Sequence, residues 1–99
     1  GLKAAFKHEP AFQEEVVLAA IMIPAALFIG DSQWERILLI ATVVLVLIAE
    51  LFNSAIEAVV DRVGTEHHEL AGRAKDIGSA AVMVTMLLTG YVWLEILFF

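Results

Sequence analysis

Residues 37–61 read ILLIATVVLVLIAELFNSAIEAVVD, an apolar run that is long enough to cross a membrane and carries polar side chains in its second half. At about 100° per residue, Glu50, Asn53, Glu57 and Asp61 fall within roughly 80° of arc on one helix. We call these four residues the polar stripe. A carboxylate near the centre of a bilayer costs at least ~2.5 kcal/mol, so it faces a partner, a cavity or an ion. The stripe therefore marks a candidate functional site on a membrane helix.

The composition of the chain indicates a membrane protein. Of its 99 residues, 61% are hydrophobic, whereas soluble domains average about 45–50%. The net charge of −6 argues against nucleic acid as a partner, because nucleic-acid binding needs a basic face. The lack of cysteine excludes disulfides and thiolate metal sites. Because the chain starts with Gly1 rather than Met, we expect further residues to precede it.

Three apolar stretches predict three membrane helices within a single domain. Each stretch reaches the ~20 residues that are needed to cross a hydrocarbon core. The predicted membrane helices cover residues 11–29, 35–61 and 77–99. Residues 1–9 look like the end of an amphipathic helix on the membrane surface, and Pro10 favours a break in the chain just before it. The predicted fold is an all-α membrane protein with three transmembrane helices and an N-terminal surface helix.

The basic residues predict the orientation of the chain in the membrane. Most of them precede the first span or lie in the charged segment 62–76, and the opposite side holds only Arg36. The residues on the basic side are Lys3, Lys7, Arg62, Arg73 and Lys75. Cytoplasmic loops carry an excess of Lys and Arg. We therefore expect the N-terminus and the 62–76 loop to lie in the cytoplasm.

The polar stripe leads directly into this charged loop, where further titratable side chains are exposed to water. They are Glu66, His67, His68, Glu69, Arg73, Lys75 and Asp76. This arrangement suits chemistry between a lipid-borne group and a water-soluble one. Carboxylates are hard ligands for Mg²⁺, which usually binds one or two of them together with substrate phosphates. Glu9 and Glu57 are both expected near the cytoplasmic interface, where they could share such an ion.

The residues alone leave other functions open. The stripe could be interhelical glue that hydrogen-bonds across a bundle, and the charged loop could only anchor the topology. A membrane glutamate also serves proton-coupled exporters, and a non-catalytic assembly subunit would use the stripe for packing.

Gly72 and Gly78 flank the start of the third span and allow another helix to approach closely.

The segment Glu50–Asp61 (ELFNSAIEAVVD), followed by RVGTEHHELAGRAKD up to Asp76, resembles the prokaryotic diacylglycerol kinase family. The pattern E-x-x-N-[ST]-A-I-E-x-x-x-D, with A-K-D at this distance, is that family's signature. The similarity covers essentially the whole chain and is nearest to the enterobacterial type. Polyprenol (undecaprenol) kinases share the signature but usually lack the run ELxGRAKD at residues 69–76. A polyprenol kinase is therefore the closest alternative.

The resemblance implies a homotrimer in the bacterial inner membrane, with active sites shared between neighbouring protomers. It implies transfer of the γ-phosphate of ATP to the free hydroxyl of diacylglycerol, which gives phosphatidate. Mg²⁺ is the implied cofactor. Glu50 would be the general base, Glu9 and Glu57 would hold the metal, and Asn53 would orient the γ-phosphate.

The resemblance also implies three groups of supporting residues. The nucleotide would be contacted by Glu9, Asn53, Glu57, Glu66, His67, His68, Lys75 and Asp76. The lipid site would include Glu15, Arg36, Glu50 and Ser79. Structural support would come from Asp61, Gly72 and Arg73. One departure concerns the family's usual Glu-Ala-Ala-Phe-Arg-Gln-Glu, which here is EPAFQEE at residues 9–15, so Pro10 bears on how Glu9 is aimed.

Overall fold

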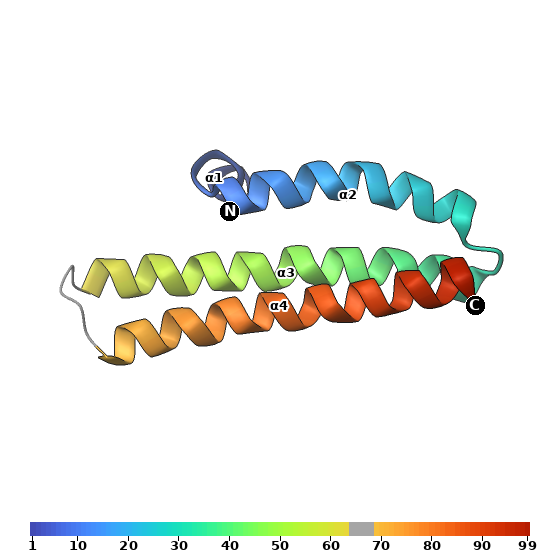
Figure 1. Cartoon of the computed structure of the whole chain (residues 1–99). Coiled ribbons are helices and arrows are strands. Elements are labelled where there is room, and N and C mark those ends of the chain that lie inside the picture. The colour runs from blue at the N-terminus through green and yellow to red at the C-terminus, as the bar shows by residue number, and fades with distance from the viewer. Residues whose placement is uncertain (64–68) are drawn as a thin grey trace.

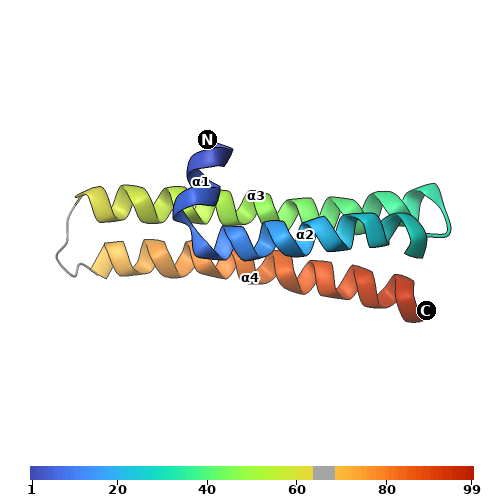
Figure 2. The same ribbon diagram turned by 90° about the horizontal axis from the view of Figure 1, so that it is seen from above.

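The computed structural model describes residues 1–63 and 69–99, and all of the regular structure in these two ranges is helical. The elements are α1 (Leu2–His8), α2 (Pro10–Ile29), α3 (Gln33–Val63) and α4 (Glu69–Phe98). The three long helices run side by side in an antiparallel arrangement, and α3 packs against both α2 and α4 (Figures 1 and 2). Each of the three is long and apolar enough to cross a membrane. The predicted class, an all-α membrane protein with three spans, is confirmed.

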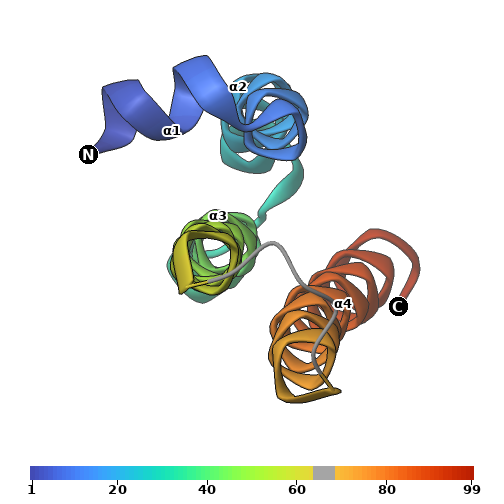
Figure 3. The same cartoon turned by 90° about the vertical axis from the view of Figure 1, so that its left-hand side faces the viewer.

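The break between α1 and α2 lies at Glu9, whose backbone is extended with φ −117° and ψ 101°. Pro10 explains this break, because it disfavours helical backbone at the residue before it and is itself well suited to the first turn of a helix. Figure 3 shows α1 leaving the axis of α2 sideways. The predicted break before Pro10 is therefore confirmed.

The connection between α2 and α3 is a short turn held by two hydrogen bonds, both of which involve Glu35. The Glu35 N–H donates to the Ser32 hydroxyl oxygen at 3.2 Å, and the Asp31 N–H donates to Glu35 Oε1 at 2.9 Å. A serine followed three residues later by a glutamate is a common start signal for a helix, because the pair satisfies N–H groups that have no partner within the helix. The two hydrogen bonds of Glu35 define where α3 begins.

The helices around the second connection are longer than the sequence predicts. The charged segment 62–76 was expected to be a loop, but α3 continues to Val63 and α4 already begins at Glu69. Residues 69–76 contain no proline and no β-branched side chain, and Gly72 is the one residue among them that disfavours a helix strongly. Glu69 and Arg73 also form an ion pair at 3.4 Å across one helical turn. Charge ends the apolar span here without ending the helix.

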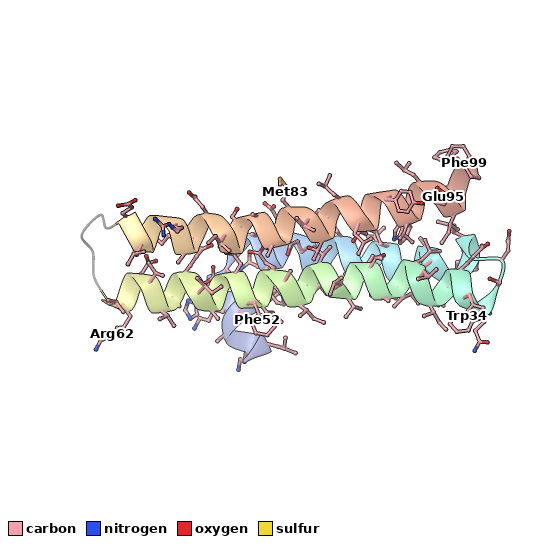
Figure 4. All side chains as sticks on the ribbon, turned by 90° about the horizontal axis from the view of Figure 1, so that it is seen from below. Trp34, Phe52, Arg62, Met83, Glu95 and Phe99 are labelled. Atoms are coloured by element: carbon pink, nitrogen blue, oxygen red, sulfur yellow. The ribbon has the colours of Figure 1, made fainter. Side chains whose placement is uncertain are left out.

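The buried core is small and lies mainly along α3. Leu39 is fully buried, and its apolar neighbours in the core are Phe12, Ala19, Ala26, Val43, Val46 and Val82. Many large apolar side chains point outward instead. Phe52 and Met83, for example, project from the outer sides of α3 and α4 (Figure 4). Outward apolar surface of this extent suits a chain surrounded by lipid or by further copies of itself.

Polar contacts join α3 and α4 at the end of the bundle that holds Trp34 and Phe99 (Figure 4). The Trp93 indole N–H donates to the Leu39 carbonyl oxygen at 3.2 Å. The Thr89 hydroxyl lies 3.1 Å from the Thr42 carbonyl oxygen and 2.7 Å from that of Thr85. These bonds tie the two helices together at the end opposite to Arg62.

Trp93→Phe removes the indole donor and keeps an aromatic ring in place. We expect the free energy of unfolding in detergent micelles to fall by about 0.6 kcal/mol, the average for an interhelical hydrogen bond in a membrane protein. Helix content followed by circular dichroism during chemical unfolding measures this loss. Trp34→Phe is the matched control, because the Trp34 side chain is 73% exposed. Equal losses for both variants would show that the Trp93 bond contributes nothing.

Candidate active site

The polar stripe on α3 passes from the interior of the bundle to its surface. Glu50 and Asn53 are buried, with 6% and 7% of their surface exposed. Glu57 is half-buried and Asp61 is exposed. The helical period places the four residues on one face, and packing against α2 and α4 covers only the first two. The stripe therefore links a buried carboxylate to a water-accessible one.

Asn53 and Glu57 form a pair within the stripe. The Asn53 Nδ2 atom donates a hydrogen bond to Glu57 Oε1 at 3.0 Å across one helical turn. The Oδ1 atom of the same amide is buried and has no hydrogen-bond partner among the described residues. A buried amide normally satisfies both of its ends, so this oxygen is an exception that needs an explanation.

The N-terminal part of α4 runs along the same stripe. Lys75 Nζ lies 2.6 Å from Asp61 Oδ1, and both side chains are substantially exposed. Gly78, one turn further along α4, is buried against Asn53. The close approach of helices that was predicted at Gly78 is therefore confirmed. Asp76 and Ser79 are exposed near this contact.

Two further carboxylates reach the stripe from the N-terminal side of the bundle. The charges of Glu57 and Glu9 act on Glu50, and the charge of Glu50 acts on Glu15. Glu15 Oε2 is buried and has no hydrogen-bond partner in the described part of the chain. Carboxylates gathered in this way need a cation or shared protons between them. Sequence reasoning placed Glu9 with Glu57, and the resemblance placed Glu15 with Glu50; in the structure the charges of Glu9, Glu57 and Glu15 all lie near that of Glu50.

The carboxylates near Glu50 suit a metal ion that binds together with a phosphate-bearing substrate. Within residues 1–63 and 69–99, no three His, Cys, Asp or Glu side chains form a ready-made metal site. Mg²⁺ does not need such a cage, because it keeps several waters and binds one or two carboxylates together with phosphate oxygens. Glu9 and Glu57, whose charges both act on Glu50, fit this kind of partial site.

A cavity of about 300 Å³ lies between α2, α3 and α4. Glu15 lies at its wall, and the remaining lining is almost entirely apolar. It includes Leu18, Met22, Val43, Leu47, Met86 and Trp93. The three helices are thus incompletely packed on the side of Glu50 that faces the centre of the apolar region.

Some predicted site residues lie away from the stripe. Arg36 precedes Glu50 by about four turns of α3, or roughly 21 Å along the helix axis, and its guanidinium donates to the Gly30 carbonyl oxygen at 3.4 Å. Arg73 pairs with Glu69 on the exposed face of α4. Gly72 is half-buried near the start of that helix. Glu66, His67 and His68 lie outside the described residues.

Comparison with known proteins identifies the chain. The family model described as prokaryotic diacylglycerol kinase matches residues 1–97. The chain belongs to the prokaryotic diacylglycerol kinase family. A diacylglycerol kinase from Haemophilus influenzae is 57% identical over 99 residues, which cover 100% of this chain and 84% of the relative. The diacylglycerol kinase of Escherichia coli K12 is 48% identical over 93 residues, covering 94% and 76% of the two chains. That of Pseudomonas aeruginosa is 48% identical over 97 residues, covering 98% and 79%.

Membership of the prokaryotic diacylglycerol kinase family confirms two predictions. The resemblance seen in residues 50–76 is correct, and so is the enzyme class, a phosphotransferase that acts on an alcohol group. Ser54, to which the sequence assigns no role, is buried beside Asn53. A serine inside an apolar helix carries no signal that separates it from backbone-bonding serines.

The Asn53–Glu57 hydrogen bond can be tested by exchanging its donor and acceptor. Asn53→Asp puts a second carboxylate against Glu57, and we expect the free energy of unfolding to fall by about 1–3 kcal/mol, the cost of an unsatisfied buried group. Adding Glu57→Gln restores a bond in which the amide now lies at position 57, so most of this loss should be recovered. The measurement is chemical unfolding in micelles. A double variant that is no more stable than Asn53→Asp alone would refute the pairing.

Proposed function

We propose that this protein transfers the γ-phosphate of ATP to the free hydroxyl of diacylglycerol and so forms phosphatidate. Family membership supports the lipid substrate and the phosphoryl transfer. The structural observation that carries the mechanism is the burial of Glu50 in a helix long enough to span a membrane. The same helix reaches the exposed ion pair of Asp61 and Lys75. A lipid-borne hydroxyl and a water-soluble nucleotide can therefore meet along one helix.

Glu50 is the proposed general base. It lies about two helical turns deeper than Glu57, at a level suited to the headgroup of an uncharged lipid. As the lipid hydroxyl oxygen attacks the γ-phosphorus, a new P–O bond forms and the bond from that phosphorus to the bridging oxygen of ADP breaks. The hydroxyl proton passes to the Glu50 carboxylate. Phosphoryl transfer otherwise asks a protein mainly for positioning and for neutralisation of charge.

Lys75 and Asn53 are proposed to hold the transferred phosphate. A lysine is a point charge well suited to phosphate oxygens, and Lys75 would exchange its Asp61 partner, now at 2.6 Å, for the nucleotide. The Asn53 amide nitrogen carries two hydrogens. One is used in the bond to Glu57, which leaves the other for the γ-phosphate. The remaining proposed nucleotide contacts are Glu66, His67, His68 and Asp76.

Glu9 and Glu57 are the proposed carboxylate ligands of Mg²⁺. When bound, the ion would neutralise phosphate oxygens of the nucleotide. The chain's own part is to hold the Glu57 carboxylate in place, which the hydrogen bond from Asn53 does. The extended backbone at Glu9 lets that side chain approach α3 from the junction of α1 and α2.

The proposed lipid contacts beside Glu50 are Glu15, Ser79 and Arg36. Glu15 lies within charge contact of Glu50, and Ser79 follows Gly78 on α4. Arg36 lies at the opposite end of α3 and would meet a different part of the lipid. Gly72, Arg73 and Asp61 are proposed to support the start of α4.

We also propose that the protein is a homotrimer with shared active sites, placed in the bacterial inner membrane with its N-terminus and residues 62–76 in the cytoplasm. The excess of basic residues on that side supports the orientation. The largely exposed apolar faces of α2 and α4 leave surface for contact between copies. The α1 helix is proposed to lie on the cytoplasmic membrane surface.

A direct test offers diacylglycerol and a polyprenol side by side in mixed micelles, with Mg-ATP that carries a labelled γ-phosphate. Labelled phosphatidate in excess is the expected product. Labelled polyprenyl phosphate in excess would favour the polyprenol kinase alternative with the same chemistry. No labelled lipid from the folded protein would contradict the proposal and favour an exporter or an assembly subunit.

Glu50→Gln removes the proposed base and keeps the size of the side chain. We expect turnover to fall by about 10²–10⁴-fold, the usual contribution of general base catalysis, while Mg-ATP binding is largely kept. Steady-state kinetics and calorimetric nucleotide binding measure the two effects. Glu95→Gln is the control, because Glu95 is exposed at the far end of α4 (Figure 4). Normal turnover with weakened ATP binding would refute the assignment.

Glu57→Gln removes one proposed ligand charge from the metal site. The Mg²⁺ concentration that gives half-maximal activity should rise at least about tenfold, as expected when a metal site loses a supporting group. Glu14→Gln serves as the control, since Glu14 is an exposed acid at the same end of the bundle. An unchanged Mg²⁺ titration for Glu57→Gln would place the metal elsewhere.

A further inference from the structure

Gly78 of α4 lies directly against Asn53 of the polar stripe. A β-carbon at this position would overlap the Oδ1 atom of Asn53 and would come within 3.7 Å of the Ile56 side chain. Gly78 is itself buried. The Asn53 amide oxygen therefore occupies the space that any other residue at position 78 would fill.

The Asn53 side chain has little freedom to move away from such an added group. Asn53 is only 7% exposed, and its Nδ2 atom is already bound to Glu57 Oε1 at 3.0 Å. Ile56 occupies the neighbouring position on α3, and one turn earlier on α4 Lys75 contacts Asp61 of the same stripe. Rotating the amide out of the way would break its bond to Glu57.

A glycine within a helix is unfavourable relative to alanine, because it costs backbone entropy. Its presence in the middle of a regular helix therefore needs a reason in packing or function. We infer that Gly78 is a positioning residue whose lack of a side chain leaves the Asn53 amide free to hold the Glu57 carboxylate in its working orientation. This inference rests on the proposed roles of Asn53 and Glu57 in the reaction.

The contact also accounts for the unsatisfied Oδ1 atom of Asn53. The oxygen faces the backbone of a glycine, where no donor lies within reach because the helix uses its own N–H groups internally. The Oδ1 atom of Asn53 stays without a hydrogen bond, while the Nδ2 atom of the same amide donates to Glu57 Oε1. A general requirement for close helix packing would not need Asn53 at all, and this difference can be tested.

Asn53 is the only asparagine in the chain, so asparagine labelled with ¹⁵N in its side chain gives one unambiguous NMR signal. Gly78→Ala should shift this signal, because the amide must rotate or move. The same variant should lower kcat by about a hundredfold, the order expected when a reacting group is misplaced by an ångström, with little change in the KM for diacylglycerol. Gly90→Ala is the matched control, because a β-carbon at Gly90 of the same helix meets nothing within 4 Å.

Stability provides a readout that does not depend on the reaction. Gly78→Ala should lower the unfolding midpoint of the otherwise unchanged protein. In the Asn53→Ala background the clash is gone, so the same substitution should leave the midpoint unchanged or raise it, since alanine favours helices. Equal losses in both backgrounds would show that Gly78 acts on packing alone and would overturn the inference.

The remaining outcomes separate the inference from the proposed function. An unshifted Asn53 signal in Gly78→Ala would overturn the steric contact. A shifted signal with normal kcat would overturn the positioning role. In that second case, the kinetics of Asn53→Ala decide what else fails. If Asn53→Ala also turns over normally, the proposed role of Asn53 in the reaction fails too; if it is inactive, that role stands and only the inference about Gly78 is lost.

Discussion

The cost of placing a carboxylate in apolar surroundings governs the arrangement of this molecule. Glu50 is almost fully covered on a helix of membrane length, and hydrocarbon gives it no hydration. Polar groups from the surrounding elements gather on the same face, where a further carboxylate adds to this cost and a cation or a shared proton relieves it. Asn53 and Glu57 follow on α3, Glu9 and Glu15 approach from the N-terminal side, and α4 contributes Lys75. The proposed active site is the place where the buried Glu50, further carboxylates and a lysine gather.

The contact between α3 and α4 has two different ends. Near Trp93, indole and hydroxyl groups donate to backbone carbonyl oxygens of α3, and these bonds hold the helices without using titratable side chains. Near Gly78 the helices meet through a glycine, an amide and an exposed ion pair. The first end fixes the helix pair and leaves the second free for groups that exchange partners. One half of the interface is thus held by bonds to backbone carbonyl oxygens, and the other half carries the proposed active site.

Much of this architecture follows from periodicity and hydropathy. The three spans and the face shared by Glu50, Asn53, Glu57 and Asp61 could be predicted, because both depend only on neighbours along one helix. The extension of α4 back to Glu69 could not, since charged residues end an apolar span without ending a helix. The contact of Gly78 with Asn53 and the approach of Glu15 to Glu50 depend on packing between segments distant in the sequence. Such packing is decided by side-chain shape, which no periodic pattern records.

The continuity of α3 from Gln33 to Val63 has a consequence for how the protein meets its surroundings. A rigid helix rises about 1.5 Å per residue, so the distance along α3 from Glu50 to the water-exposed end of the stripe is fixed. The lipid hydroxyl, by contrast, floats at a height set by the thickness of the bilayer. Thinner or thicker membranes tilt a span or deform the bilayer around it. The distance between Glu50, the proposed base, and the lipid hydroxyl is therefore set by the protein and the membrane together.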